Sequence, residues 1–154
     1  MIATGSSVWN GSFHEGSGSI STASQTLTER PYTFASRFEG AEGASPEELL
    51  AAAHAGCYNH ALANIFHKNG LSVGTIRTTA EVDMGSDAVS PGIQGVHITV
   101  DAHMPDVSHE RFRQFAERAA RTCAISKALS VDITLTATLA REQGSRGAGE
   151  QGSS

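Results

Sequence analysis

The apolar residues of this chain follow a helical pattern in one long segment and an alternating pattern in several others. In the long segment, from Ser45 to Phe66, nearly every position is apolar or small. Ser45 is a favourable N-cap residue, and Pro46 fits the first helical turn because its missing N–H would have no partner there. A helix that is apolar on every side is normally buried. The pattern therefore predicts a long buried helix with Cys57 near its middle.

Two strands, a second helix and a further strand are predicted after the long helix. Residues 73–84 and 93–104 alternate apolar with polar side chains, as half-buried strands do. Ser108 can cap a second helix, along which apolar residues recur at helical spacing as far as Cys123. Residues 131–139 alternate again. This order of elements predicts an α+β fold.

The segment before the long helix, residues 6–40, contains short extended runs separated by turn residues. This arrangement favours an antiparallel hairpin followed by a third strand that includes Phe34 and Phe38. On sequence alone, Arg37 is a surface arginine on that strand. Aromatic residues in such a sheet, Trp9 among them, are more often core residues than parts of a pocket wall.

Length and charge exclude several classes of partner. A chain of 154 residues is most simply one domain, which we place at residues 1–140, whereas residues 141–154 have the composition of a disordered tail. The net charge of -5 and the pI near 5.7 argue against nucleic acid and anionic membranes as partners. Neither a signal peptide nor an apolar run of about 18 residues is visible, so we expect a cytoplasmic protein.

The two cysteines, Cys57 and Cys123, allow several interpretations. A free cysteine often packs as a small buried hydrophobe. If the two helices pack together, however, the thiols can meet and form a redox pair. The spacing of His54, Cys57 and His60 raises a metal site, with Cys123 as a fourth ligand, although His54 and His60 diverge by about 120° on a helical wheel. A Cys-His hydrolase is a further alternative, for which a buried apolar helix is an unusual setting.

Glu47 lies ten residues before Cys57 on the same predicted helix. At the helical rise per residue, the two are roughly 15 Å apart along the axis and cannot touch within one chain. If they belong to one site, the simplest arrangement is an antiparallel pair of these helices across a two-fold axis. Glu47 of one subunit would then approach Cys57 of the partner subunit.

Two motifs, RFEG followed by SPEELLAAAHAGC and, later, TCAISKAL, closely resemble the OsmC/Ohr family of organic hydroperoxide reductases, and within it the OsmC branch. The likeness extends over roughly residues 8–139. It implies an OsmC-like fold, in which antiparallel sheets pack around the long buried helix, and an intertwined homodimer that works without metal or flavin. By position, Cys57 matches the peroxidatic cysteine and Cys123 the resolving cysteine, while Arg37 and Glu47 match the family's arginine and glutamate.

The resemblance also implies a reaction and its partners. Arg37, oriented by Glu47, would hold Cys57 as a thiolate, which attacks an organic hydroperoxide, releases an alcohol and becomes a sulfenic acid. Cys123 would condense with it to a disulfide, and a dithiol reductant, such as a dihydrolipoyl protein, would restore the enzyme. Such an activity serves defence against oxidative or osmotic stress. Ala124 stands where the family usually has proline, which predicts a looser turn at Cys123 and slower resolution.

Two functions of other classes remain open. A non-enzymatic module on the same fold could bind an apolar ligand at the dimer interface, and it would need neither cysteine. A Cys/His metal-binding protein would instead carry stoichiometric metal and lose stability with a chelator.

Overall fold

The computed structural model of the protein describes residues 1–140, and these fall into two compact units. The units consist of residues 1–50 with 86–90, and of residues 51–85 with the described residues from 91 onward. The single domain expected over residues 1–140 stays a prediction. The expected disordered tail lies outside the described residues.

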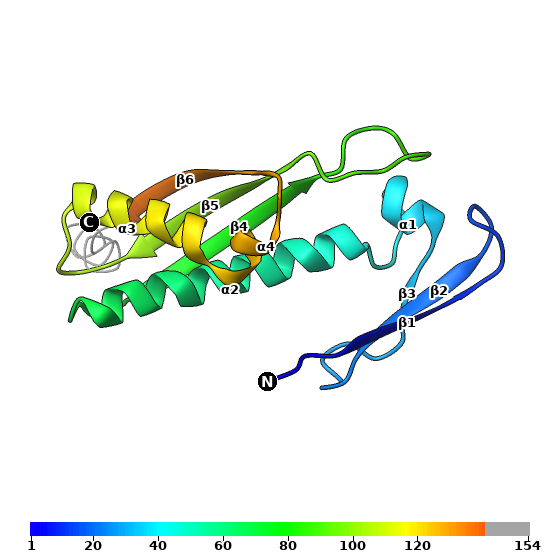
Figure 1. Ribbon diagram of the computed structural model, residues 1–154, viewed down its shortest axis with the longest axis horizontal. Coiled ribbons are helices and arrows are strands. Elements are labelled where there is room, and N and C mark those ends of the chain that lie inside the picture. Colours follow the sequence, from blue (N-terminus) through cyan, green and yellow to red (C-terminus); the bar gives the residue numbers. More distant parts are fainter. Residues whose placement is uncertain (141–154) are drawn as a thin grey trace, which may run out of the picture. The chain divides into compact units, whose positions relative to one another are not determined.

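The first unit contains a small antiparallel sheet. Its strands are β1 (Gly5–Asn10), β2 (Ser17–Thr22) and β3 (Arg30–Tyr32), in the order β1-β2-β3 (Figure 1). Residues 16–22, which are rich in glycine and serine, therefore belong to the predicted hairpin, because β2 has the sequence SGSIST.

The third strand is shorter than predicted, because the aromatic residues beyond Tyr32 are helical. Helix α1 spans Phe34–Phe38 and begins at a capping box. The Thr33 hydroxyl accepts the Ser36 N–H at 3.0 Å, and the Ser36 hydroxyl accepts the Thr33 N–H at 2.8 Å. This pair satisfies two backbone donors at the helix start, so that Arg37 lies on a helix rather than on a strand.

Helix α2 (Pro46–Lys68) is unbroken, begins directly after Ser45 as predicted, and ends two residues beyond the predicted segment. The Ser45 hydroxyl accepts the Glu48 N–H at 3.4 Å, and the Ser45 carbonyl accepts the Leu49 N–H at 3.1 Å. At the other end, Gly70 takes a φ of 67°, a left-handed conformation that glycine adopts without steric cost.

The prediction that α2 is buried on every side is wrong for the single chain. One face is buried and carries His54, Tyr58, Leu62, Ile65 and Phe66. Another face, which includes Ala52, Ala53 and Gly56, is exposed. The small apolar residues made the helix look uniformly buried in sequence, although the chain itself covers only the face with the larger side chains.

The second unit is built on a three-stranded mixed sheet in the order β4-β5-β6. Strands β4 (Thr75–Asp83) and β5 (Gly95–His103) are antiparallel, whereas β5 and β6 (Asp132–Ala140) are parallel. The expectation of purely antiparallel sheets is therefore wrong. Between β5 and β6 the chain forms α3 (His109–Thr122) and α4 (Ala124–Ala128), and a connection of this length permits the crossover that parallel strands need.

Helices α2 and α3 pack on the apolar face of this sheet (Figure 1). Strand β5 is the most deeply buried, with Ile98, Val100 and Ala102 fully inaccessible to solvent. Ser108 caps α3 as predicted, and its hydroxyl accepts the Arg111 N–H at 3.2 Å. The α+β class is confirmed. Within residues 1–140, no helix is long and apolar enough to cross a membrane.

Candidate functional site

An ion pair joins Arg37 of α1 to Glu47 in the first turn of α2, within the first unit. The Arg37 Nε donates to both carboxylate oxygens, at 3.0 and 3.2 Å, and Nη2 donates to Oε1 at 2.5 Å. The Ser45 hydroxyl donates to Oε2 of the same carboxylate at 3.1 Å. Two donors of one planar guanidinium thus fix its orientation, a geometry that lysine could not reproduce.

The ion pair holds both partners in their charged forms. Burial pushes the pKa of Glu47 upward, but hydrogen bonds from Arg37, from the backbone and from Ser45, together with the charge of Arg37, outweigh it and leave the pKa below its ordinary value. The hydrogen bond to Glu47 raises the pKa of Arg37, against the opposing effect of burial. Arg37 is therefore a fixed cation whose orientation Glu47 controls.

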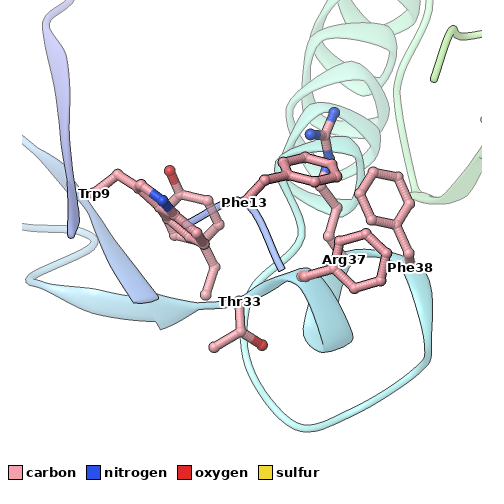
Figure 2. A pocket seen from close by; sticks show the side chains of 7 residues that line it. Trp9, Phe13, Thr33, Arg37 and Phe38 are labelled. Carbon is pink, nitrogen blue, oxygen red and sulfur yellow. The ribbon is translucent and has the colours of Figure 1, made fainter. Parts of the chain in front are cut away.

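Arg37 lies at the wall of an aromatic cavity of about 220 Å³ within the first unit. The cavity is lined by Trp9, Phe13, Tyr32, Thr33, Phe34, Arg37 and Phe38 (Figure 2). The Arg37 guanidinium lies 4.8 Å from the centre of the Phe38 ring. These aromatic residues form a pocket wall rather than a core, contrary to the expectation from sequence. An apolar cavity with one charged group at its wall suits a ligand with an organic body and a polar end.

Both cysteines line one open cleft in the second unit, with a volume of about 650 Å³. Cys57 comes from the middle of α2 and is half-buried, whereas Cys123 is buried, with 2% of its surface exposed. Both thiols are free. The structure therefore brings together the two cysteines that the sequence singled out.

Cys123 occupies a break between two helices, not a position inside one. It is the C-cap of α3 and the N-cap of α4, with an extended backbone (φ -63°, ψ 147°). The Ser126 N–H donates to the Cys123 sulfur at 3.4 Å, and the thiol donates to the Ser126 hydroxyl at 3.2 Å. Ala124 is the first residue of α4.

The His54 side chain contacts Ser126 and is not arranged as a metal ligand. It is fully buried, and its Nε2 lies 2.7 Å from the Ser126 hydroxyl. Burial lowers the pKa of His54, because the charged imidazole loses its hydration. Among residues 1–140, no three His, Cys, Asp or Glu side chains are grouped as metal ligands would be, so the set of His54, Cys57, His60 and Cys123 does not converge.

Comparison with known proteins places this architecture in a family. The family model described as OsmC-like protein matches residues 39–137. Peroxiredoxin OsmC from Escherichia coli is 34% identical over 131 residues, which cover 85% of this chain and 92% of that protein. The chain belongs to the OsmC-like family.

Further relatives agree with this assignment. The OsmC-like chain is 28% identical, over 65% of its length and 71% of the relative's, to organic hydroperoxide resistance protein-like 2 from Staphylococcus epidermidis. Its fold matches the crystal structure of an OsmC-like protein from Mycoplasma pneumoniae with a TM-score of 0.69. That match has 14% sequence identity and covers 90% of this chain and 97% of the other, so it supports the fold.

Two features of this OsmC-like chain were not predicted from its sequence. Phe13 was not considered for the cavity wall, because it lies in the turn between β1 and β2 and no periodicity marks it. Ser126 was missed as the link between Cys123 and His54. The spacing of Cys123 and Ser126 is that of an N-cap residue and its partner, so their contact could have been predicted from the sequence. The contact of Ser126 with His54 spans 72 positions and depends on the fold.

Proposed function

We propose that the protein is a thiol-dependent peroxidase that reduces organic hydroperoxides to alcohols. The observation that carries this proposal is that Cys57 and Cys123 line the same cleft as free thiols. The names of its relatives, peroxiredoxin and organic hydroperoxide resistance protein, support the same reaction class.

The first step forms a sulfenic acid on Cys57. Its thiolate attacks the terminal oxygen of the hydroperoxide, the O–O bond breaks, and the alkoxide leaves as an alcohol after taking a proton. Arg37 stabilises the thiolate and the charge that develops on the leaving oxygen, and Glu47 keeps the guanidinium in the orientation this requires.

The second step forms a disulfide. The Cys123 sulfur attacks the sulfenic sulfur of Cys57, and the hydroxyl leaves as water together with the thiol proton. A dithiol reductant, such as a dihydrolipoyl group, then returns both cysteines to thiols by exchange. The cycle needs no metal or flavin, and we assign it to defence against oxidative or osmotic stress.

The substrate class follows from the aromatic cavity beside Arg37. Its walls of Trp9, Phe13 and Phe38 favour a hydroperoxide with an apolar body over hydrogen peroxide, which has none. The Arg37 guanidinium would then face the peroxide group while the rings hold the organic part.

A homodimer would complete the site. Glu47 and Cys57 are ten residues apart on one unbroken helix, so they can act together only if a second copy is involved. The exposed face of α2 with Ala52, Ala53 and Gly56 would allow close approach of the same helix from that copy. Apart from its chain neighbours and the adjacent backbone of α2, no atom of the described residues lies within 4 Å of the position that a Cβ on Gly56 would occupy.

Two cysteine variants test the reaction. With cumene hydroperoxide and a dithiol reductant, we expect Cys57→Ser to show no turnover. Without the reductant, Cys123→Ser should consume one hydroperoxide per chain and then stop, because its sulfenic acid has no thiol with which to condense. Dimedone labelling of Cys123→Ser should locate the sulfenic acid on Cys57. Continued turnover by Cys57→Ser would refute the proposal.

A binding module for an apolar ligand is the second candidate, because the aromatic cavity would serve it equally well. Cumyl alcohol, which lacks the peroxide bond, distinguishes the two functions. A binding module would bind it with the same affinity in the wild type and in both cysteine variants and would consume no hydroperoxide.

A further inference from the structure

A buried chain of three polar side chains leads away from the second cysteine. The Cys123 thiol contacts the Ser126 hydroxyl at 3.2 Å, and the same hydroxyl contacts His54 Nε2 at 2.7 Å. The three side chains come from the α3–α4 junction, α4 and α2. Their residues are 2%, 8% and 0% exposed, respectively, so bulk water has little access to this chain.

The direction of each hydrogen bond among these three side chains follows from which atom can donate. Because the Cys123 thiol donates to the Ser126 oxygen, the hydrogen of Ser126 is free to donate to His54 Nε2. This requires a neutral imidazole with its proton on Nδ1, and burial favours the neutral form by lowering the pKa of His54. Within residues 1–140, the buried Nδ1 has no hydrogen-bond partner. Nε2, the imidazole nitrogen that accepts a hydrogen bond, therefore faces the Ser126 hydroxyl.

We propose that His54 and Ser126 relay the thiol proton away from Cys123 during disulfide formation. The inference rests on the proposed function, in which Cys123 attacks the sulfenic acid of Cys57. As the Cys123 sulfur attacks, its proton moves to the Ser126 oxygen while the Ser126 proton moves to His54 Nε2. The new S–S bond replaces the S–OH bond, and the departing hydroxide becomes water by taking the proton that the imidazolium ring gives up.

The relay solves a difficulty created by burial. A thiolate, not a thiol, is the attacking species, and an ordinary thiol with a pKa of about 8.5 is only a few per cent ionised at neutral pH. Cys123 is almost inaccessible to water that could remove its proton. Its neighbour Tyr58 is no substitute base, since its hydroxyl donates to the Ala116 carbonyl at 3.0 Å, and burial, followed by the proximity of Cys123, raises its pKa. Ser126 touches the reacting sulfur, whereas His54 is a positioning residue that acts through it.

The test separates the two steps of the cycle. Reduced full-length protein is mixed with one equivalent of cumene hydroperoxide, and peroxide consumption and disulfide formation are followed separately by rapid quenching and intact mass. The variants are His54→Gln, which keeps a hydrogen-bond acceptor near Nε2 but no base, and Ser126→Ala, which removes the connecting hydroxyl. His109→Gln, an exposed histidine at the start of α3, is the matched control.

In the wild type and in His109→Gln, we expect the rate of disulfide formation to change little across neutral pH. In His54→Gln and Ser126→Ala, it should be on the order of 30-fold slower at about pH 7 and rise about tenfold per pH unit, because hydroxide must then take the thiol proton in place of the missing relay. Peroxide consumption in the first step should stay within about twofold of the wild type, because the relay acts on the second step.

Three outcomes would overturn the relay or its premise. Wild-type rates and pH profiles in both variants would show that no proton passes through His54. A slowing that is equal at every pH would assign His54 and Ser126 to packing only. Failure of the wild type itself to consume hydroperoxide would instead refute the proposed function, and it is recognised by the absence of the first step in every protein tested.

Discussion

Replacing Glu47 by glutamine removes the charge of the ion pair while keeping the size of the side chain. An amide can accept only a weaker hydrogen bond from Arg37 and can present its own N–H groups to the guanidinium. A buried hydrogen bond to a charged group contributes about 1.5–3 kcal/mol, whereas an exposed ion pair contributes about 0–1 kcal/mol. The side chains of Arg37 and Glu47 are 29% and 11% exposed, so Glu47, the residue that is replaced, lies close to the buried case.

We therefore expect Glu47→Gln to lower the free energy of unfolding by about 2 kcal/mol, which corresponds to a fall in Tm of about 4–8 °C for a chain of this length. Glu48→Gln is the matched control. Glu48 is exposed in the same helical turn, so its replacement removes the same favourable interaction with the helix dipole, about 0.3–1 kcal/mol, without breaking an ion pair.

The dependence on pH gives the prediction a second, independent readout. The folded-state pKa of Glu47 is lowered, so its stabilising contribution is complete above the unfolded carboxyl pKa of about 4.3 and is lost as the pH falls through the folded value. The difference between wild type and Glu47→Gln, measured by urea unfolding at fixed protein concentration, should thus be largest at neutral pH and vanish in acid. Equal stabilities of the two glutamine variants at neutral pH, or a difference that persists unchanged in acid, would refute the reasoning.

Three other substitutions test separate parts of the structure. Ala124→Pro should raise the free energy of unfolding by about 0.4–1 kcal/mol, because Ala124 is the first residue of α4 and Cys123 already has the extended backbone that proline requires before it. A lower stability in thermal unfolding would contradict this geometry. Phe13→Ala should raise the KM for cumene hydroperoxide by about five- to tenfold, which corresponds to about 1–1.5 kcal/mol of lost apolar contact, and should leave the kinetics with hydrogen peroxide unchanged. An equal effect on both substrates would contradict binding of the organic part in this cavity. Gly56→Leu should leave the single chain folded, because space is open there and leucine favours a helix, but the molar mass measured by light scattering should fall from that of a dimer to that of a monomer. An unchanged dimer would exclude this face of α2 from the interface.

Local sequence signals predicted most helix ends and strands correctly. Ser45 and Gly70 mark the ends of α2 because capping depends on residues adjacent in the chain. The alternation over residues 131–139 likewise predicted β6 to within one residue at each end. The helical segment at Phe34 was mistaken for a strand, because aromatic residues favour strands in general while the Thr33 capping box decides the local structure.

The remaining features depend on contacts between distant segments. The parallel pairing of β5 with β6 is set by how the intervening helices pack, and strand alternation is the same for parallel and antiparallel partners. Similarly, the ion pair of Arg37 with Glu47 was expected only from the family resemblance. The Cys123–Ser126–His54 chain was not expected at all, because a histidine near a cysteine in sequence suggests a metal ligand as readily as a base.

The central claim is that Cys57 and Cys123 form a disulfide in response to an organic hydroperoxide. It is tested most directly by thiol titration and intact mass, under non-reducing conditions, of reduced protein before and after one equivalent of cumene hydroperoxide. The account predicts loss of both thiols, a mass lower by two hydrogens, and an internal Cys57–Cys123 link in the peptide map. Two thiols still free, with the hydroperoxide unconsumed, would contradict it.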